Sequence, residues 1–396
     1  MVDVYNKGLN ETIKVDRILG KIEGSNLGPT VVFFGGIHGN ETSGVFALND
    51  VLKKINRSDV CGTLYGIAGN LRALKKHQRF IEDDLNRLWT KEHIELIKSK
   101  TVLNADESEL LALLEILNDI LDTHTPPFYF IDLHTTSSKT LPFITINDAL
   151  INRKFSEQFP VPIVLGIEEY LSGPLLSYVN QLGYVSLGFE SGQHDDLSAI
   201  KNSITFIYLT LVYSGILEQK RVINFNQYYE QLKEQSCHTF NVFEIIYLHQ
   251  IQKHDDFEML NGFRSFESIK KGTKLAISNK EEVFAPHKGN IFMPLYQKRG
   301  AEGFFIIKPI KPFFLKLSSV LRRIKTDTFL GLLPGISWAD KNRGILQVNL
   351  GVAKFFAKSL FHLLGYRNRQ ITDDYIILNN RERVAKTEIY KKEPWY

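Results

Sequence analysis

Short apolar runs alternate with helix-like segments over roughly the first 220 residues. The runs that have the length of buried strands are 29–36, 63–68, 128–133, 161–165 and 184–189. Helices are expected at 41–54 and 107–121, where apolar residues recur every three or four positions, and at the apolar segment 200–216. Strands that alternate with helices predict an α/β fold with a largely parallel sheet covered by helices on both faces.

The pattern changes after residue 222. Residues 241–249 and 282–293 are expected to form strands, with turns such as those at 271–272 and 287–290 and no clear intervening helix. This part is therefore predicted to be a small β-rich domain that covers the site. Beyond residue 310, basic residues outnumber acidic ones. The predicted domains are therefore a catalytic domain at 1–222, the β-rich domain at 223–310 and a basic C-terminal extension at 311–396.

The basic extension has two interpretations. Its charges can form a solvated helical face that packs on the body of the protein. Alternatively, segments 317–325 and 354–369 bind a membrane surface or a partner protein. The sequence favours the first interpretation, because charged runs on helices usually face water.

Composition indicates a soluble globular protein, with 43% hydrophobic and 23% charged residues among 396. The net charge of +4 is too small to indicate nucleic-acid binding. Only Cys61 and Cys237 are present, which favours a reducing compartment over a disulfide framework. No secretory signal is apparent at residues 1–7, and no run approaches the roughly 18 apolar residues of a membrane-spanning helix. We therefore predict a cytoplasmic location without a transmembrane segment.

Candidate chemistry lies at the ends of predicted strands. His38 and Glu41 follow a glycine pair after the first run, and His134 and Glu190 close two later runs. A His-x-x-Glu pair alone is usually a solvated polar pair, and a lone histidine at a strand end is usually structural. In proteins with an open parallel sheet, however, substrates and cofactors bind beyond the carboxyl ends of the strands. Two imidazoles and one carboxylate form the protein ligand set of an open catalytic zinc site.

Several ordered motifs resemble those of one known family. They are Gly-Gly-x-His-Gly-Asn-Glu at 35–41, Asn-x-Arg-Ala-x-Lys-Lys-x-x-Arg-Phe at 70–80, Asp-Leu-Asn-Arg at 84–87, Asp-Leu-His-Thr-Thr at 132–136, and the later Glu190. Over roughly residues 30–195 the chain resembles the succinylglutamate desuccinylase and aspartoacylase family, a branch of the zinc carboxypeptidase fold. The resemblance implies a mixed, mostly parallel sheet flanked by helices, followed here by the β-rich domain and the basic extension.

The resemblance also implies which residues bind the metal. His38, Glu41 and His134 would hold one zinc ion per chain, and Asp84 would orient His38. A histidine that ligates a metal usually donates its other N–H group to a carboxylate or a carbonyl, which suits Asp84.

Further roles are implied for residues around the metal. Glu190 would take a proton from the zinc-bound water and pass it to the leaving amine. Arg79 would polarise the scissile carbonyl and stabilise the oxyanion. Asn86 and Arg87 would hold a substrate carboxylate, because a guanidinium forks onto two carboxylate oxygens.

The sequence departs from the family in two places. An arginine that selects acidic substrates in aspartoacylases has no counterpart in 177–182. In that family a tyrosine lines the pocket. Here Glu302 lies at or near the position of that tyrosine, with Tyr296 nearby. The sequence therefore does not predict specificity for aspartate or succinylglutamate.

Together these features predict a zinc-dependent amidohydrolase for a small carboxylate-bearing amide, such as an N-acyl amino acid. One alternative is a carboxypeptidase that acts on short peptides through the same residues. A second is a non-catalytic binding or regulatory protein that kept the fold. The predicted partner is a small molecule and not nucleic acid, and the sequence is compatible with a homo-oligomer.

Overall fold

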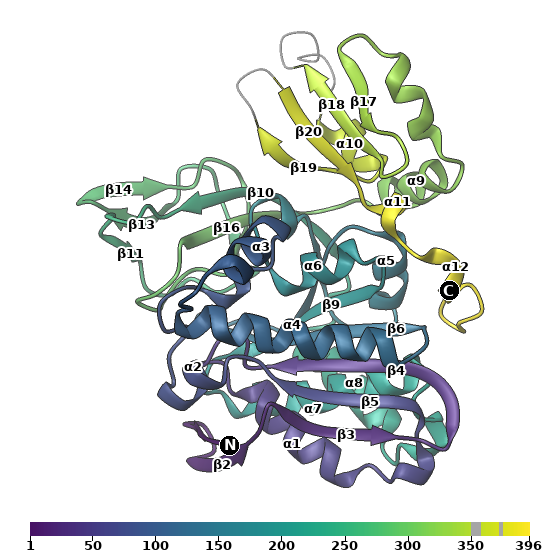
Figure 1. Cartoon of the computed structure of the whole chain (residues 1–396). Coiled ribbons are helices and arrows are strands. Elements are labelled where there is room, and N and C mark those ends of the chain that lie inside the picture. Colours follow the sequence, from purple (N-terminus) through teal and green to yellow (C-terminus); the bar gives the residue numbers. More distant parts are fainter. Residues whose placement is uncertain (350–357, 372–374) are drawn as a thin grey trace.

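The core of the protein is an eleven-stranded mixed sheet (Figure 1). This computed structural model describes residues 1–349, 358–371 and 375–396. The strands run in the order β12-β15-β16-β10-β8-β7-β9-β6-β4-β5-β3. Their bounds are β3 (Ile18–Glu23), β4 (Asn26–Gly35), β5 (Cys61–Ala68), β6 (Phe128–Thr136), β7 (Phe143–Ile146), β8 (Ile163–Leu165), β9 (Val185–Gln193), β10 (Val242–Gln250), β12 (Ser268–Ile269), β15 (Gly289–Phe292) and β16 (Glu302–Pro309).

The centre of this sheet is parallel. β4 pairs in parallel with β5 and β6, and β6 pairs in parallel with β9. β7 runs antiparallel to β9 but parallel to β8, and β8 pairs in parallel with β10. The predicted mixed α/β sheet flanked by helices is thus confirmed, and its parallel pairs lie among the inner strands.

Both faces of the central strands are buried. In β4, Val31 and Phe33 join one apolar cluster, whereas Val32 and Phe34 join another. This alternation follows from the two-residue period of a strand, and it requires helices on both sides. Helices that contribute to the two clusters include α1 (Ser43–Lys54), α3 (Lys91–Ser99), α4 (Ala105–Thr123), α5 (Leu150–Ser156), α6 (Leu175–Gln181), α7 (Leu197–Tyr213) and α8 (Phe225–Gln235). Short helices α2 (Leu71–Lys76), η1 (Arg57–Asp59), η2 (Leu85–Arg87), η3 (Ile167–Glu169) and η4 (Gln219–Arg221) lie in the connections.

Residues 223–310 extend this sheet. β10 lies beside β8, so the sheet continues across the predicted boundary at 222, and the domain limits stay a prediction. The segment 282–293, predicted to form strands with a turn at 287–290, contains two strands that are separated just before residue 289. Its first part is β14 (Glu281–Phe284), which pairs with β13 (Lys274–Ser278) in a small sheet completed by β11 (Phe257–Met259). Its second part is β15, which pairs with β16, so the chain changes sheets between the two strands.

The C-terminal extension forms a separate four-stranded antiparallel sheet, drawn at the top of Figure 1. Its elements are α9 (Pro312–Arg323), η5 (Thr326–Leu332), β17 (Ile336–Asp340), β18 (Ile345–Asn349), α10 (Lys358–Leu363), β19 (Tyr366–Ile371), β20 (Tyr375–Asn380), α11 (Arg381–Val384) and α12 (Thr387–Tyr390). At the other end of the chain, β1 (Val2–Asn6) and β2 (Glu11–Val15) form a hairpin. No helix in the described part of the chain has the length and apolarity needed to cross a membrane.

A buried ionic cluster joins the extension to the body. Asp148 follows β7 and is fully buried. Its carboxylate lies 2.5 Å from Arg153 Nε, 2.9 Å from Arg322 Nη2 and 2.8 Å from Arg367 Nη2. The prediction of a solvated basic face is therefore wrong for Arg322 and Arg367, which are buried because their acidic partners lie in the body. In the predicted surface segment 354–369, residues 354–357, including Lys354, lie outside the described residues.

The last residues of the chain return to the body (Figure 1). The hydroxyl of Tyr390 donates to the carbonyl of Phe128 at 2.5 Å and accepts from the amide of Val185 at 3.0 Å. Trp395 packs against Tyr129 and Phe155. The ionic cluster and this aromatic contact thus both attach the extension to the body.

Candidate active site

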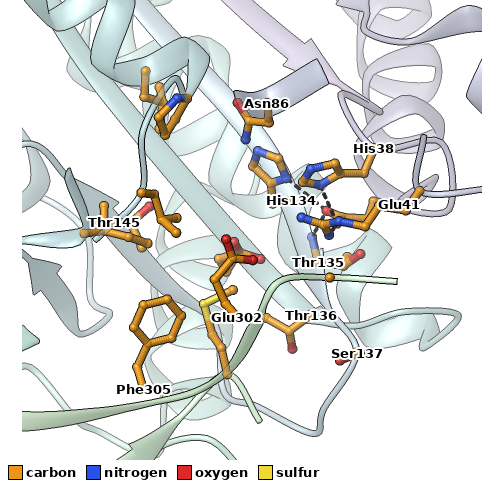
Figure 2. Close-up of a pocket in the computed structure, with 18 of the residues that line it drawn as sticks. His38, Glu41, Asn86, His134, Thr135, Thr136, Ser137, Thr145, Glu302 and Phe305 are labelled. Atoms are coloured by element: carbon orange, nitrogen blue, oxygen red, sulfur yellow. Dashed lines mark hydrogen bonds and ion pairs between the residues drawn. The ribbon is translucent and has the colours of Figure 1, made fainter. Parts of the chain in front are cut away.

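The predicted metal ligands meet at the carboxyl ends of the central strands (Figure 2). Potential ligand atoms of His38, Glu41 and His134 lie within 4.8 Å of one another, and all three residues are buried. His38 and Glu41 are on the turn between β4 and α1, and His134 is on β6. Gly36 gives this turn its positive φ of 74°, and a Cβ on Gly39 would come within 2.0 Å of the Ala73 carbonyl carbon.

The Glu41 carboxylate lies between the two imidazoles. Nδ1 of His38 is 2.7 Å from one oxygen, and Nδ1 of His134 is 2.9 Å from the other. The outer Nε2 atoms also meet carboxylates, at 3.1 Å from Asp84 and 2.6 Å from Asp132. Both rings are therefore oriented by an outer acidic group and present Nδ1 to the centre. Outer partners of this kind are usual for histidines that ligate a metal.

Neighbouring opposite charges favour the charged forms of Glu41 and His134. Burial alone would raise the pKa of Glu41, but His38 and His134 hold it well below its usual range. Burial alone would lower the pKa of His134, but Asp132 and Glu41 raise it well above its usual range. The carboxylate of Glu41 is thus ionised and available to a cation.

Glu190 lies on β9 beside His134 on β6, because these two residues are paired in the parallel register. Its side chain lines the pocket and is 7% exposed. Oε2 has no hydrogen-bond partner among the described residues. Burial raises the pKa of Glu190 to about 8, and the nearby charge of His134 opposes that rise. A carboxylate with a raised pKa suits proton transfer near neutral pH.

Arg79 and Asp84 come from the segment between α2 and η2. The backbone amide of Gly39 donates to the carbonyl of Arg79 at 3.1 Å, which fixes that segment against the His38 turn. Arg79 lies 3.2 Å from Asp84 and 3.4 Å from Glu41. Asp84 also accepts from the amide of Asn86 at 2.9 Å. Asp84, the residue predicted to orient His38, is thus held by two groups, the Arg79 guanidinium and the Asn86 amide.

Asn86 and Arg87 also line the pocket. The side-chain oxygen of Asn86 accepts from the amide of Leu175 at 2.9 Å, so its NH₂ group is the part available to a ligand. Arg87 donates through Nη2 to Glu302 at 2.9 Å. Tyr296, the other residue singled out from the β-rich part, donates instead to the carbonyl of Leu260. Glu302 therefore reaches the pocket and forms an ion pair with Arg87.

Sequence reasoning missed three residues of this site. Asp132 lies two residues before His134 on the same face of β6, and the two-residue period of a strand is the signal that identifies it. Asp106 accepts from the backbone amides of residues 81–83 and so anchors the segment that follows Arg79. His194 lies 2.7 Å from the Thr135 hydroxyl and lines the pocket. No sequence motif marks Asp106 or His194.

The residues present fit a divalent cation. Three carboxylates, those of Glu41, Asp84 and Asp132, contact the two histidines, whereas Arg79 is the guanidinium that pairs with two of them. This buried excess of negative charge is costly without a compensating positive charge. Two nitrogen ligands and one carboxylate ligand also match the composition of open zinc sites.

Part of this chain is similar in sequence to a known protein family. Residues 27–207 match the family model described as the succinylglutamate desuccinylase/aspartoacylase catalytic domain. Succinylglutamate desuccinylase from Pseudomonas fluorescens is 36% identical over 92 residues, which cover 23% of this chain and 27% of that protein. A probable aspartoacylase from Acaryochloris marina is 31% identical over 128 residues, or 31% of this chain and 40% of that protein. The chain thus spans well under half the length of these curated relatives.

Solved structures agree on the fold. A succinylglutamate desuccinylase/aspartoacylase from Rhodobacter sphaeroides superposes with a TM-score of 0.56 and 16% identity, covering 74% of this chain and 88% of that one. The product-bound ectoine utilization protein EutE (DoeB) from Ruegeria pomeroyi gives a TM-score of 0.54 and 18% identity, covering 72% and 87%. At these identities the likeness establishes the architecture alone.

Proposed function

This chain belongs, through residues 27–207, to the succinylglutamate desuccinylase/aspartoacylase family, and from that premise we propose that it is a zinc-dependent hydrolase. The bond cleaved is an amide in a small carboxylate-bearing substrate of the N-acyl amino acid type. The proposed zinc ligands are His38, Glu41 and His134. One observation carries the proposal: both Nδ1 atoms converge on Glu41, while both Nε2 atoms meet carboxylates.

Zinc bound there would polarise a carbonyl and lower the pKa of a water molecule towards about 7. The remaining chemistry belongs to side chains of this protein. Glu190 would accept the proton of the attacking water and deliver it to the leaving nitrogen, because its carboxylate lies beside His134 and carries a raised pKa.

Three further side chains would position the substrate. Arg79 would stabilise the negative charge that develops on the carbonyl oxygen, since its guanidinium is held at the centre by Asp84. Asn86 would donate its NH₂ group to a substrate carboxylate. Arg87 would place a positive charge beside the same carboxylate. The ion pair between Arg87 and Glu302 partly neutralises that charge.

A hydrolysis screen with zinc-loaded protein tests this proposal. N-acyl amino acids and dipeptides are incubated with the protein before and after chelation, and after zinc is restored. We expect release of a free amine from N-acyl amino acids, its loss on chelation and its recovery with zinc. Preferential cleavage of dipeptides would support the carboxypeptidase alternative. Hydrolysis that persists without metal would contradict the proposed centre, and binding without turnover would indicate a non-catalytic protein.

A further inference from the structure

One wall of the pocket is apolar. It is formed by side chains from the end of β7, from the segment around η3, from α6 and from the β-rich part; these are Ile146, Ile167, Leu171, Leu176, Met293 and Phe305. In Figure 2, Phe305 and Thr145 lie across the pocket from His38 and Glu41, with Glu302 between them. The pocket thus has a polar end and an apolar end.

Two polar side chains near the apolar end are paired with each other. Asn147 donates to the hydroxyl of Ser177 at 3.2 Å, so these two side chains bond each other. Phe305 is 2% exposed and packs against Phe292 and Tyr170. A ring without a hydroxyl group provides no donor for a charged ligand.

Both arginines of the pocket have carboxylate partners. Arg79 is paired with Asp84 at 3.2 Å, and Arg87 is paired with Glu302 at 2.9 Å. Among the described residues that line the pocket, no lysine or third arginine occurs. Glu190 and Glu302 contribute carboxylates of their own. A second substrate carboxylate would therefore enter an apolar or already acidic environment, at a cost in binding.

We propose that the substrate has a single carboxylate and carries an apolar group, aliphatic or aromatic, that occupies this apolar end. The inference rests on the proposed amide hydrolysis at the same site. The carboxylate is held at Asn86 and Arg87, and the apolar group packs against Ile167, Leu171 and Phe305. Dicarboxylic substrates such as N-acetylaspartate are excluded by the same walls. Each buried methylene strengthens binding roughly fourfold.

Matched substrate pairs test the proposal in the zinc-loaded protein. On the acyl side, N-hexanoyl-alanine is compared with N-succinyl-alanine, and on the amino-acid side, N-acetyl-leucine with N-acetyl-aspartate. We expect the apolar member to have at least tenfold higher kcat/KM in one pair or both, and the acidic member to be preferred in neither. Equal rates in both pairs, or preference for an acidic member, would overturn the inference.

Binding separates this inference from the proposed hydrolysis. The same four compounds are titrated by calorimetry into the zinc-loaded Glu190→Gln protein. Tighter binding of the apolar compounds supports the apolar pocket even if the wild-type protein hydrolyses none of them, in which case only the proposed function fails. Tighter or equal binding of the acidic compounds contradicts the pocket assignment whatever the turnover.

Two variants test which side chains cause the preference for apolar over acidic compounds. Leu171→Arg places a cation at the apolar end and should raise relative affinity for the acidic compounds at least tenfold. Leu111→Arg is its matched control, because Leu111 is a partly buried leucine on α4 that does not line the pocket. Glu302→Gln releases Arg87 from its carboxylate partner. It should also raise the affinity for the acidic compounds relative to the apolar ones, without inserting a bulky side chain. An unchanged ratio in a folded Glu302→Gln protein would contradict the charge argument.

Discussion

Replacement of Asp148 by asparagine should destabilise the protein severely. The change preserves the size of the side chain but removes the negative charge at the junction between the body and the extension. Three guanidinium groups converge on this carboxylate, and the side chains of Asp148 and Arg322 are both 0% exposed. The loss therefore leaves positive charge in a buried space with too little compensation.

The magnitude follows from the partners that remain. Arg322 keeps Glu382 at 3.1 Å and Arg367 keeps Glu169 at 2.9 Å, whereas Arg153 loses its carboxylate partner. Removal of one partner from a buried ion pair typically costs about 3–5 kcal/mol. We expect Asp148→Asn to fall in this range. Asp50→Asn is the control, because its pair with Lys54 is solvent-exposed and should contribute about 0–1 kcal/mol.

Urea unfolding followed by tryptophan fluorescence measures both variants. Trp89 lies in the body, Trp338 in the extension and Trp395 at the returning C-terminus, so loosening of the extension alone is also detected. A loss below about 1 kcal/mol for Asp148→Asn, equal to that of the control, would refute the role given to the cluster.

The dependence on pH gives an independent check. Burial alone would raise the pKa of Asp148, but the three arginines hold it well below its usual range. A carboxylate with a depressed folded-state pKa stabilises the protein above its unfolded pKa of about 3.9. The stability difference between wild type and Asp148→Asn should therefore be constant from neutral pH to about pH 5 and shrink as the pH falls further.

Two other substitutions give distinct outcomes. Asp84→Asn should weaken zinc binding about 10–100-fold in a competition titration with a chromophoric chelator, because Asp84 orients His38; unchanged affinity would argue against that role. Tyr390→Phe should cost about 1–3 kcal/mol in urea unfolding, because the buried carbonyl of Phe128 and amide of Val185 lose a shared partner; a neutral effect would mean that the C-terminal contact adds no stability.

Local sequence patterns predicted the centre of the fold well. The apolar runs that became β4, β5, β6 and β9 are long and uninterrupted because both faces of these strands are buried. β7, with four residues, was not predicted, whereas the shorter β8 was predicted from the apolar run 161–165. The strands expected within 282–293 are present, but they belong to two different sheets, and no periodicity records such a change.

Candidate ligands were visible because they follow strands in short motifs. The partners that define their surroundings were not, since they lie far away along the chain. Arg87 and Glu302 are 215 residues apart, and Asp148 and Arg367 are 219 apart. A run of basic residues therefore suggested a solvated face, whereas tertiary folding buries several of them against carboxylates. Such long-range charge pairs require the three-dimensional structure.

The central claim is that one set of residues binds zinc and another transfers the proton. It is tested most directly by measuring zinc content and N-acyl amino acid hydrolysis together in wild type, His134→Ala and Glu190→Gln. The account predicts about one zinc per chain in wild type and in Glu190→Gln, nearly complete loss of turnover in Glu190→Gln, and loss of both zinc and turnover in His134→Ala. Full zinc occupancy in His134→Ala, or near-normal turnover in Glu190→Gln, would contradict it.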